Sequence, residues 1–243
     1  MTIARGGGGF ATTRWTMVSA AGGLADAAAN KALAELCQIY WPPLYSYLRR
    51  RGHDREEAED LTQGFFASLL ERQGLQSADP ARGRFRGFLL TALKRYVINE
   101  YERATAARRG GPARLPLTLD FDEAERSYAR DLGSGDTPER EFDRKWAALC
   151  IDRALASLRA EYHEAGKHSV ADALLPYLTD SGQLPPYRST AEQLLMSEGA
   201  VKVAVHRLRQ RFGSILRLQI ADTVLSPADA DDEMRELIRV VAS

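Results

Sequence analysis

The chain has 243 residues, of which 44% are hydrophobic, and its formal net charge is zero. This length and hydrophobic content suffice for one sizeable core or two small ones, and they argue against a disordered or collagen-like chain. Cys37 and Cys150 lie far apart in apolar stretches, so neither a disulfide framework nor a cysteine-based metal site is expected. No apolar run approaches the roughly 18 to 20 residues that cross a bilayer, so we expect a cytoplasmic protein without membrane insertion.

The net charge of zero hides a separation of charge along the chain. Basic residues gather within 82–109 and again within 188–217, whereas the stretches 120–143 and 222–236 are acidic. The charge of a local surface, rather than the average, decides where a polyanion can bind. The two basic stretches are therefore candidates for contact with nucleic acid.

Apolar residues recur at spacings of three and four along the whole chain and strand signals are almost absent, so the chain is predicted to be all-α. A first helix carries an apolar stripe over residues 33–48, and Pro42 and Pro43 are expected to interrupt or kink it. A second helix is predicted to begin near Arg55. Asp54 is the expected N-cap of this second helix.

The second helix has two different faces, and a third helix follows it. The apolar face of the second helix holds Ala58, Leu61, Phe65 and Leu69. Its polar face holds Glu56, Asp60 and Gln63. The third helix is predicted to run to about Arg103, with an apolar stripe made of Phe85, Phe88, Leu89, Ala92 and Tyr96.

Glycines, prolines and acids between residues 104 and 137 give that stretch the composition of a tether rather than of a packed element. Pro138 suits the first turn of a following helix. The sequence therefore predicts two small helical domains joined by a flexible tether. The expected boundaries are an N-terminal extension at 1–29, a first domain at 30–109, a linker at 110–137, a second domain at 138–223 and an acidic C-terminal extension at 224–243.

The stretch 189–217 has the pattern of a helix-turn-helix. A short helix over 190–195 is followed by a tight turn at Met196 and Ser197, and a longer helix begins at Glu198 with Ser197 as its cap. The predicted buried stripe of the longer helix consists of Val201, Val205, Leu208, Phe212 and Ile215. Its other faces are basic, which is the division that a helix in the major groove needs. An amphipathic surface helix with solvated arginines remains the alternative.

Basic residues also alternate with aromatic ones in the predicted third helix. Cations attract the phosphate backbone, and aromatic faces can stack on unpaired bases at roughly 1 to 3 kcal/mol each. Phe85, Phe88 and Tyr96 share the buried stripe and are interpreted as core. The residues expected to contact DNA are Arg84, Arg86, Lys94, Arg95 and Asn99.

Three motifs, in this order, resemble the extracytoplasmic-function (ECF) sigma factors of bacterial RNA polymerase. EAEDLTQGFFASLLE at 57–71 is similar to the core of region two, which docks on the polymerase. GRFRGFLLTALKRYVINEYER at 83–103 is similar to the adjoining helix that melts and reads the minus-ten element. SEGAVKVAVHRLRQRF at 197–212 resembles the recognition helix of region four, which reads the minus-thirty-five element. The family usually has glycine in the turn where this chain has Leu195.

The resemblance implies a transcription initiation factor whose partners are core RNA polymerase and promoter DNA. The residues that it assigns to polymerase binding are Glu56, Asp60 and Gln63. Those that it assigns to the minus-ten element are Arg84, Arg86, Lys94, Arg95 and Asn99. Those that it assigns to the minus-thirty-five element are Ser197, Lys202, Val203, His206, Arg207 and Arg211. It leaves open whether an anti-sigma protein or a kinase controls the factor.

The sequence also bears on two other classes of function, a stand-alone regulator and an enzyme. A stand-alone helix-turn-helix regulator is the principal alternative, and the polar face of the second helix argues against it. The chain has no HExxH, CxxC or phosphate-binding glycine motif, so we expect no enzyme, no catalytic residue, no cofactor and no metal. The C-terminal extension has Met234, Leu237, Ile238 and Val241 at helical spacing. It is either a regulatory segment that docks on a basic face or a helix that completes the second core.

Overall fold

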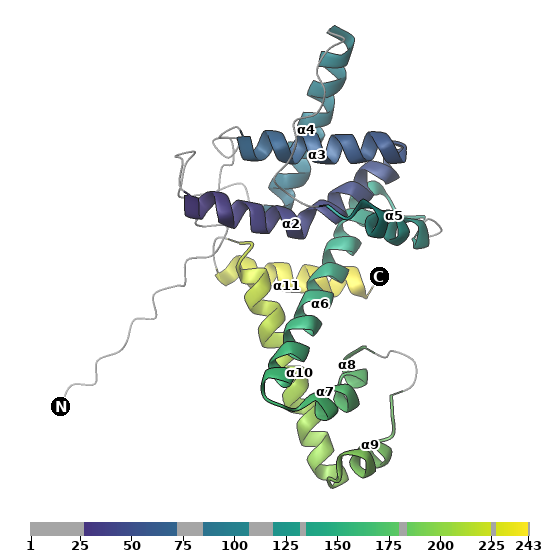
Figure 1. Ribbon diagram of the computed structural model, residues 1–243, viewed down its shortest axis with the longest axis vertical. Helices are drawn as coiled ribbons and strands as arrows, with labels where there is room; N and C mark the ends of the chain where they lie inside the picture. Colours follow the sequence, from purple (N-terminus) through teal and green to yellow (C-terminus); the bar gives the residue numbers. More distant parts are fainter. Residues whose placement is uncertain are drawn as a thin grey trace, which may run out of the picture. The chain divides into compact units, whose positions relative to one another are not determined.

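The structure is a computed structural model, and it describes residues 27–71, 85–106, 119–131, 135–179, 184–224 and 227–242. Within these ranges all regular structure is helical and no strand occurs, which confirms the all-α prediction (Figure 1). The chain divides into two compact units. Unit 1 comprises Met1–Trp146 and Ala221–Asp232, and unit 2 comprises Ala147–Ile220 and Glu233–Ser243.

Unit 1 begins with α2 (Ala27–Arg50), which runs without a break through Pro42 and Pro43. The prolines therefore do not interrupt the helix, whereas the kink that was expected as the alternative stays a prediction. Each proline removes a backbone donor and crowds the preceding turn, at a cost of about 3 kcal/mol. Burial of the neighbouring side chains Trp41, Leu44 and Tyr45 offsets this cost and keeps the helix continuous.

Helix α3 (Arg55–Glu71) starts where the sequence predicts. The side chain of Asp54 accepts a hydrogen bond from the backbone N–H of Glu57 at 2.9 Å, which confirms Asp54 as the N-cap. Helix α4 (Phe85–Ala106) follows and comes close to α3 at Gly64. A Cβ atom at Gly64 would overlap the hydroxyl of Tyr96, so any larger residue here would displace the end of that side chain.

The core of unit 1 is built from large side chains of the first three helices. The fully buried ones include Tyr40, Leu44, Leu48, Phe66, Phe85 and Leu89. Of the predicted stripe on α4, Phe85 and Leu89 are buried, while Phe88, Ala92 and Tyr96 are half-buried. The predicted apolar face is thus confirmed, with Leu93 as an additional fully buried member.

A short helix, α5 (Phe121–Arg130), lies inside the stretch that was expected to be a tether. Asp120 caps it by accepting from the backbone N–H of Glu123 at 3.0 Å, and Ala124 and Tyr128 are buried. The helix packs on α2. The expectation of an unpacked linker is therefore wrong for residues 121–130, because three apolar side chains at helical spacing form a small amphipathic face that composition alone conceals.

Helix α6 (Pro138–Glu164) begins at Pro138, as predicted, and Thr137 caps it by accepting from the backbone N–H of Arg140 at 3.3 Å. The division between the units falls within this helix, after Trp146, rather than in the stretch 110–137. The first turns of α6 therefore take part in the packing of unit 1.

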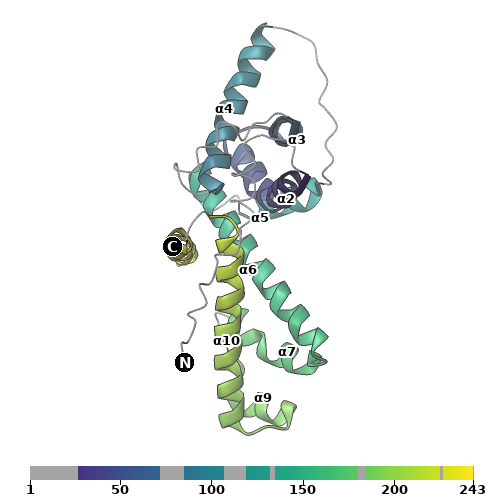
Figure 2. The same cartoon turned by 90° about the vertical axis from the view of Figure 1, so that its left-hand side faces the viewer.

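Unit 2 contains the rest of α6 followed by a series of shorter helices and one long one. They are α7 (His168–Leu174), α8 (Pro176–Thr179), α9 (Tyr187–Leu194) and α10 (Glu198–Ala221). Figure 2 shows α9 lying against the first turns of α10. The short helix expected over 190–195 begins three residues earlier, at Tyr187.

The connection between α9 and α10 is a tight turn built around Leu195. This residue has φ 54° and ψ 42°, the left-handed conformation, and its side chain is 95% exposed. Ser197 caps α10 by accepting from the backbone N–H of Ala200 at 3.2 Å, as predicted. On α10 itself Val201, Val205, Leu208 and Ile215 are buried and Phe212 is half-buried, which confirms the predicted stripe.

The C-terminal extension forms α11 (Pro227–Val241). Its buried side chains are Ala230, Glu233 and Leu237. Of the apolar residues noted at helical spacing, Leu237 is buried, Met234 is half-buried, and Ile238 and Val241 are exposed. None of the described helices is long and apolar enough to cross a membrane.

Candidate nucleic-acid and protein interfaces

The outer face of α3 is acidic. Glu56 and Asp60 are exposed and Gln63 is half-buried. Arg55, the one basic residue in the sequence of α3, is held by Glu59 at 2.7 Å and by Asp122 of α5. Within the described ranges, neither Glu56 nor Asp60 has an ion-pair partner. The negative charge of this face is therefore available to a basic partner.

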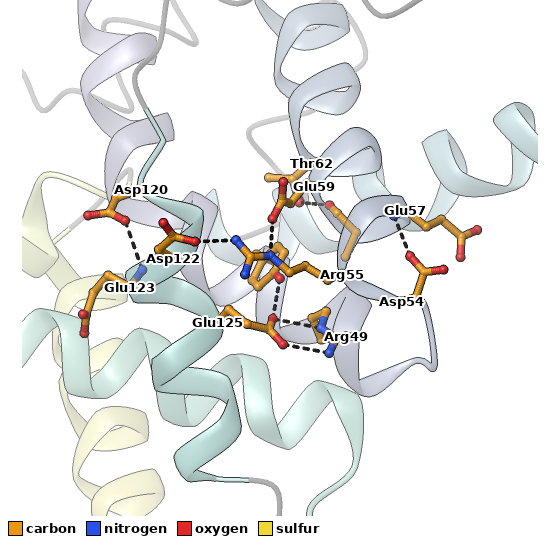
Figure 3. Close-up of polar contacts among 12 residues, drawn as sticks. Arg49, Asp54, Arg55, Glu57, Glu59, Thr62, Asp120, Asp122, Glu123 and Glu125 are labelled. Carbon is orange, nitrogen blue, oxygen red and sulfur yellow. Dashed lines mark hydrogen bonds and ion pairs between the residues drawn. The ribbon is translucent and has the colours of Figure 1, made fainter.

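Helix α5 is fastened to α2 and α3 by a cluster of polar contacts, shown in Figure 3. Arg49 donates to both carboxylate oxygens of Glu125, at 2.8 and 3.0 Å, and the hydroxyl of Tyr45 donates to the same carboxylate. The ring of Phe121 lies against the ring of Trp41, with centroids 5.2 Å apart. Sequence reasoning missed this helix, although the spacing of its apolar residues after a capping Asp is a signal for it.

The ionisation of Glu125 reflects two opposing causes. Burial works to raise the pKa of its carboxyl group, but the hydrogen bonds from Arg49 and Tyr45 outweigh burial and hold that pKa below its usual value. Burial and the bond to Glu125 both raise the pKa of the Tyr45 hydroxyl. The carboxylate is thus the charged partner at neutral pH, and the tyrosine remains a donor.

Two of the residues predicted to contact the minus-ten element are engaged by α6. Arg86 is buried, forms an ion pair with Asp143 and places its guanidinium 4.4 Å from the centre of the Trp146 ring. A role for Arg86 as an exposed DNA contact is therefore contradicted by its burial. Lys94 is exposed, but its ammonium group pairs with Glu139 at 2.8 Å. Arg84 lies outside the described residues.

The other two predicted contacts on this helix are exposed. Arg95 and Asn99 lie one helical turn apart on α4, and their side chains have no ion-pair or hydrogen-bond partner among the residues that the structure describes. Tyr101 lies further along α4, and its hydroxyl donates to Glu57 at 2.6 Å, which lowers the pKa of that carboxyl. Arg95 and Asn99 therefore form the accessible polar pair of α4.

The first half of α10 presents a second accessible surface. Lys202, Val203, His206 and Arg207 are all exposed. The side chains of His206 and Arg207 have no ion-pair partner in the described part of the chain. Arg211 differs, because it makes a forked pair with Glu161 of α6 at 2.6 and 2.8 Å. This pair joins α10 to α6. Arg211 is therefore already engaged within the protein, unlike His206 and Arg207.

Residues 36–107 match the family model of sigma-70 region 2. This stretch includes most of α2 and all of α3 and α4, the helices that carry the acidic face and the Arg95–Asn99 pair. The likeness to sigma-70 region 2 covers less than half of the chain. No curated protein and no solved structure matched the chain.

The region 2 domain supports a sigma-factor role in transcription initiation, with RNA polymerase and promoter DNA as partners. Sigma factors are non-enzymatic initiation factors. In the described ranges no group of three or more His, Cys, Asp or Glu side chains is arranged to hold a metal ion.

Proposed function

We propose that the chain is an ECF-type sigma factor that binds core RNA polymerase and directs it to promoters by reading two DNA elements. The observation that carries this proposal is the region 2 match over residues 36–107, combined with the uncompensated acidic face of α3 within it. The polymerase supplies the chemistry, and this chain supplies binding energy. Its domain plan in this proposal is region 2 at 30–109 and region four at 138–223.

Polymerase docking is assigned to Glu56, Asp60 and Gln63. Two exposed carboxylates at positions i and i+4 of one helix make a compact negative patch. The nearby cation, Arg55, is held between Glu59 and Asp122, so it does not cancel this patch. Complementary charge of this kind accelerates encounter with a basic partner and fixes the orientation of the complex.

Contact with the minus-ten element is assigned to Arg95 and Asn99, with Arg84 as a further prediction. Extrusion of a base from the duplex costs a few kcal/mol, so a phosphate contact alone does not hold a strand open. A cation with an amide one turn away can combine a phosphate contact with a hydrogen bond to a base edge. Lys94 joins them only when it leaves Glu139.

Recognition of the minus-thirty-five element is assigned to α10. We infer that α9, the turn at Leu195 and α10 act as a helix-turn-helix, with Lys202, Val203, His206 and Arg207 facing the major groove. Ser197 accepts a hydrogen bond as the cap of α10, so its predicted DNA contact uses the O–H donor, which can still reach a phosphate oxygen. Recognition by two linked domains raises the effective concentration of the second contact once the first is made.

The test of the docking assignment is capture of core polymerase by the full chain and by the double variant E56Q/D60N. We expect the variant to bind at least tenfold more weakly, because two interface charges are removed without a change in shape. Glu123→Gln is the matched control, since Glu123 is an exposed acid of α5 that pairs with Arg126 of the same helix. A stand-alone regulator would bind an operator duplex without polymerase, and equal capture of all three proteins would contradict the assignment.

A further inference from the structure

The exposed surface of the first half of α10 consists of Lys202, Val203, His206 and Arg207. The Lys202 side chain of this surface has an aromatic partner. Its ammonium nitrogen lies 5.5 Å from the centre of the Tyr187 ring, at the first position of α9. Tyr187 in turn stacks on Tyr177, with ring centroids 5.2 Å apart and an angle of 8° between the planes. The three side chains form a column that ends at the recognition helix.

The base of this column is fixed. Tyr177 is buried, and its hydroxyl lies within hydrogen-bond distance of the carbonyl of Pro185 and of the hydroxyl of Thr190, at 2.9 Å in both cases. Arg209 of α10 donates to the backbone carbonyl of Tyr177 at 3.3 Å. Tyr177 is therefore anchored to the segment before α9, to α9 and to α10, and the Tyr187 ring stacks on this buried and hydrogen-bonded ring.

A lysine side chain loses much conformational entropy when it is ordered. A lysine without a neighbouring contact loses this entropy only when it binds DNA, which weakens binding. A ring beneath the ammonium group restricts the lysine before DNA arrives, because the negative face of the ring attracts the cation. The ammonium group keeps its N–H donors for other acceptors, since the ring occupies one side of it. Exposed cation–π contacts of this kind correspond to about a two- to five-fold effect on an equilibrium.

We propose that Tyr187 is a positioning residue that determines base specificity through Lys202. A lysine held in place donates to one base edge, such as O6 and N7 of guanine, whereas a freely moving lysine also binds neighbouring phosphates of any sequence. The ring therefore increases discrimination between sequences more than it increases total affinity. This inference rests on the proposed function, because Lys202 must face DNA.

The experiment uses holoenzyme made from core polymerase and the full chain. The ligand is a duplex carrying the minus-thirty-five sequence selected from a random library, compared with its single-base-pair variants. Tyr187→Leu should reduce discrimination about two- to five-fold, and Tyr187→Phe, which keeps the ring, should not. Lys202→Ala should reduce discrimination, and adding Tyr187→Leu to it should cause no further loss.

Each other result contradicts the proposal. Additive losses in the double variant, or equal losses for Tyr187→Phe and Tyr187→Leu, would make Tyr187 a merely structural residue. Full discrimination by Lys202→Ala would remove the residue through which Tyr187 acts. If wild-type holoenzyme selected no sequence at all, the proposed function itself would be wrong. The wild-type result therefore distinguishes failure of the proposed function from failure of the proposal for Tyr187.

A second measurement uses the wild-type chain alone. It requires neither DNA nor the Tyr187→Leu variant. Reductive methylation with ¹³C places a methyl probe on each lysine and keeps its charge. In the wild-type chain the Lys202 methyl resonance should lie upfield of that of Lys167, which is exposed, because the Tyr187 ring current acts on it. A Lys202 resonance at the position of the exposed lysine would overturn the proposal.

Discussion

Helices α4 and α10 are both basic, and both carry residues that the sequence assigns to DNA, yet their cations have different surroundings. On α4, Arg86 and Lys94 pair with Asp143 and Glu139, acids that lie 57 and 45 residues away in the sequence. On the first half of α10, Arg207 has no such acid among the described residues. A basic residue is a candidate DNA contact only where the fold leaves it free, and the fold decides this through residues that are distant in sequence.

The largest expected effect separates a packing arginine from a free one on α4. Arg86→Ala should lower the free energy of unfolding by about 2 to 3 kcal/mol, because it removes a buried ion pair and the contact with Trp146. Arg95→Ala should change it by less than about 0.5 kcal/mol and should weaken binding of single-stranded promoter DNA. Urea denaturation and DNA titration of both variants check this. Equal stabilities would contradict the distinction.

The second effect concerns the contact between α5 and α2. Glu125→Gln should lower the free energy of unfolding at neutral pH by about 1 to 2 kcal/mol, because it removes a charged hydrogen-bond acceptor of Arg49. The pKa of Glu125 is lowered in the folded state, so its stabilising contribution is complete above the ordinary pKa of 4.5 and is lost as the pH falls through the folded value.

Denaturation of the wild type and of Glu125→Gln across this acidic range measures the difference. The two stabilities should converge as the pH falls. A constant difference at all pH values would show that the Glu125 charge does not contribute to docking of α5.

The third effect contrasts two arginines of α10. Arg207→Ala should weaken binding to the minus-thirty-five duplex by about tenfold, the lower range for loss of a base or phosphate contact. Arg211→Ala should affect DNA binding less, because Arg211 is engaged by Glu161. Titration of holoenzyme with duplex at two salt concentrations compares them. A larger loss for Arg211→Ala would reverse the assignment.

The smallest effect concerns the turn between α9 and α10. Leu195→Gly should raise the free energy of unfolding by about 0.5 to 1 kcal/mol, because the left-handed conformation is unfavourable for leucine and allowed for glycine. Little burial is lost, since the side chain is 95% exposed. Leu195→Ala should give no such gain, because alanine also has a Cβ atom. Thermal unfolding of both variants is the measurement, and equal midpoints would contradict this reason.

Local patterns were sufficient to predict the starts and N-caps of α3 and α10, although they missed α5. Asp54 and Ser197 cap the helices that they were expected to cap, because an N-cap depends on the residues that directly follow it. The left-handed turn persists although Leu195 stands where glycine is usual, because burial on both flanking helices fixes the backbone there. Helix α2 passes through its two prolines for a related reason, since tertiary packing outweighs local preference.

Local patterns could not predict whether a candidate site residue is buried and paired or exposed. The burial of Arg86 depends on Asp143 and Trp146, whose approach to α4 no spacing rule reveals. The attachment of α5 depends likewise on Arg49, far from it in the sequence. The exposure of Arg95 and Asn99 on α4 agrees with their prediction as accessible residues, whereas their contact with DNA stays a prediction.

The most direct test of the account is run-off transcription by purified core polymerase on a genomic fragment library, with and without the full chain. The account predicts that the chain makes the polymerase start at a distinct set of promoters sharing two elements at a fixed spacing. It also predicts that E56Q/D60N abolishes these starts, while Arg207→Ala weakens those that depend most on the upstream element. If the polymerase started at the same sites and with the same efficiency in the presence and in the absence of the chain, the central claim would be wrong.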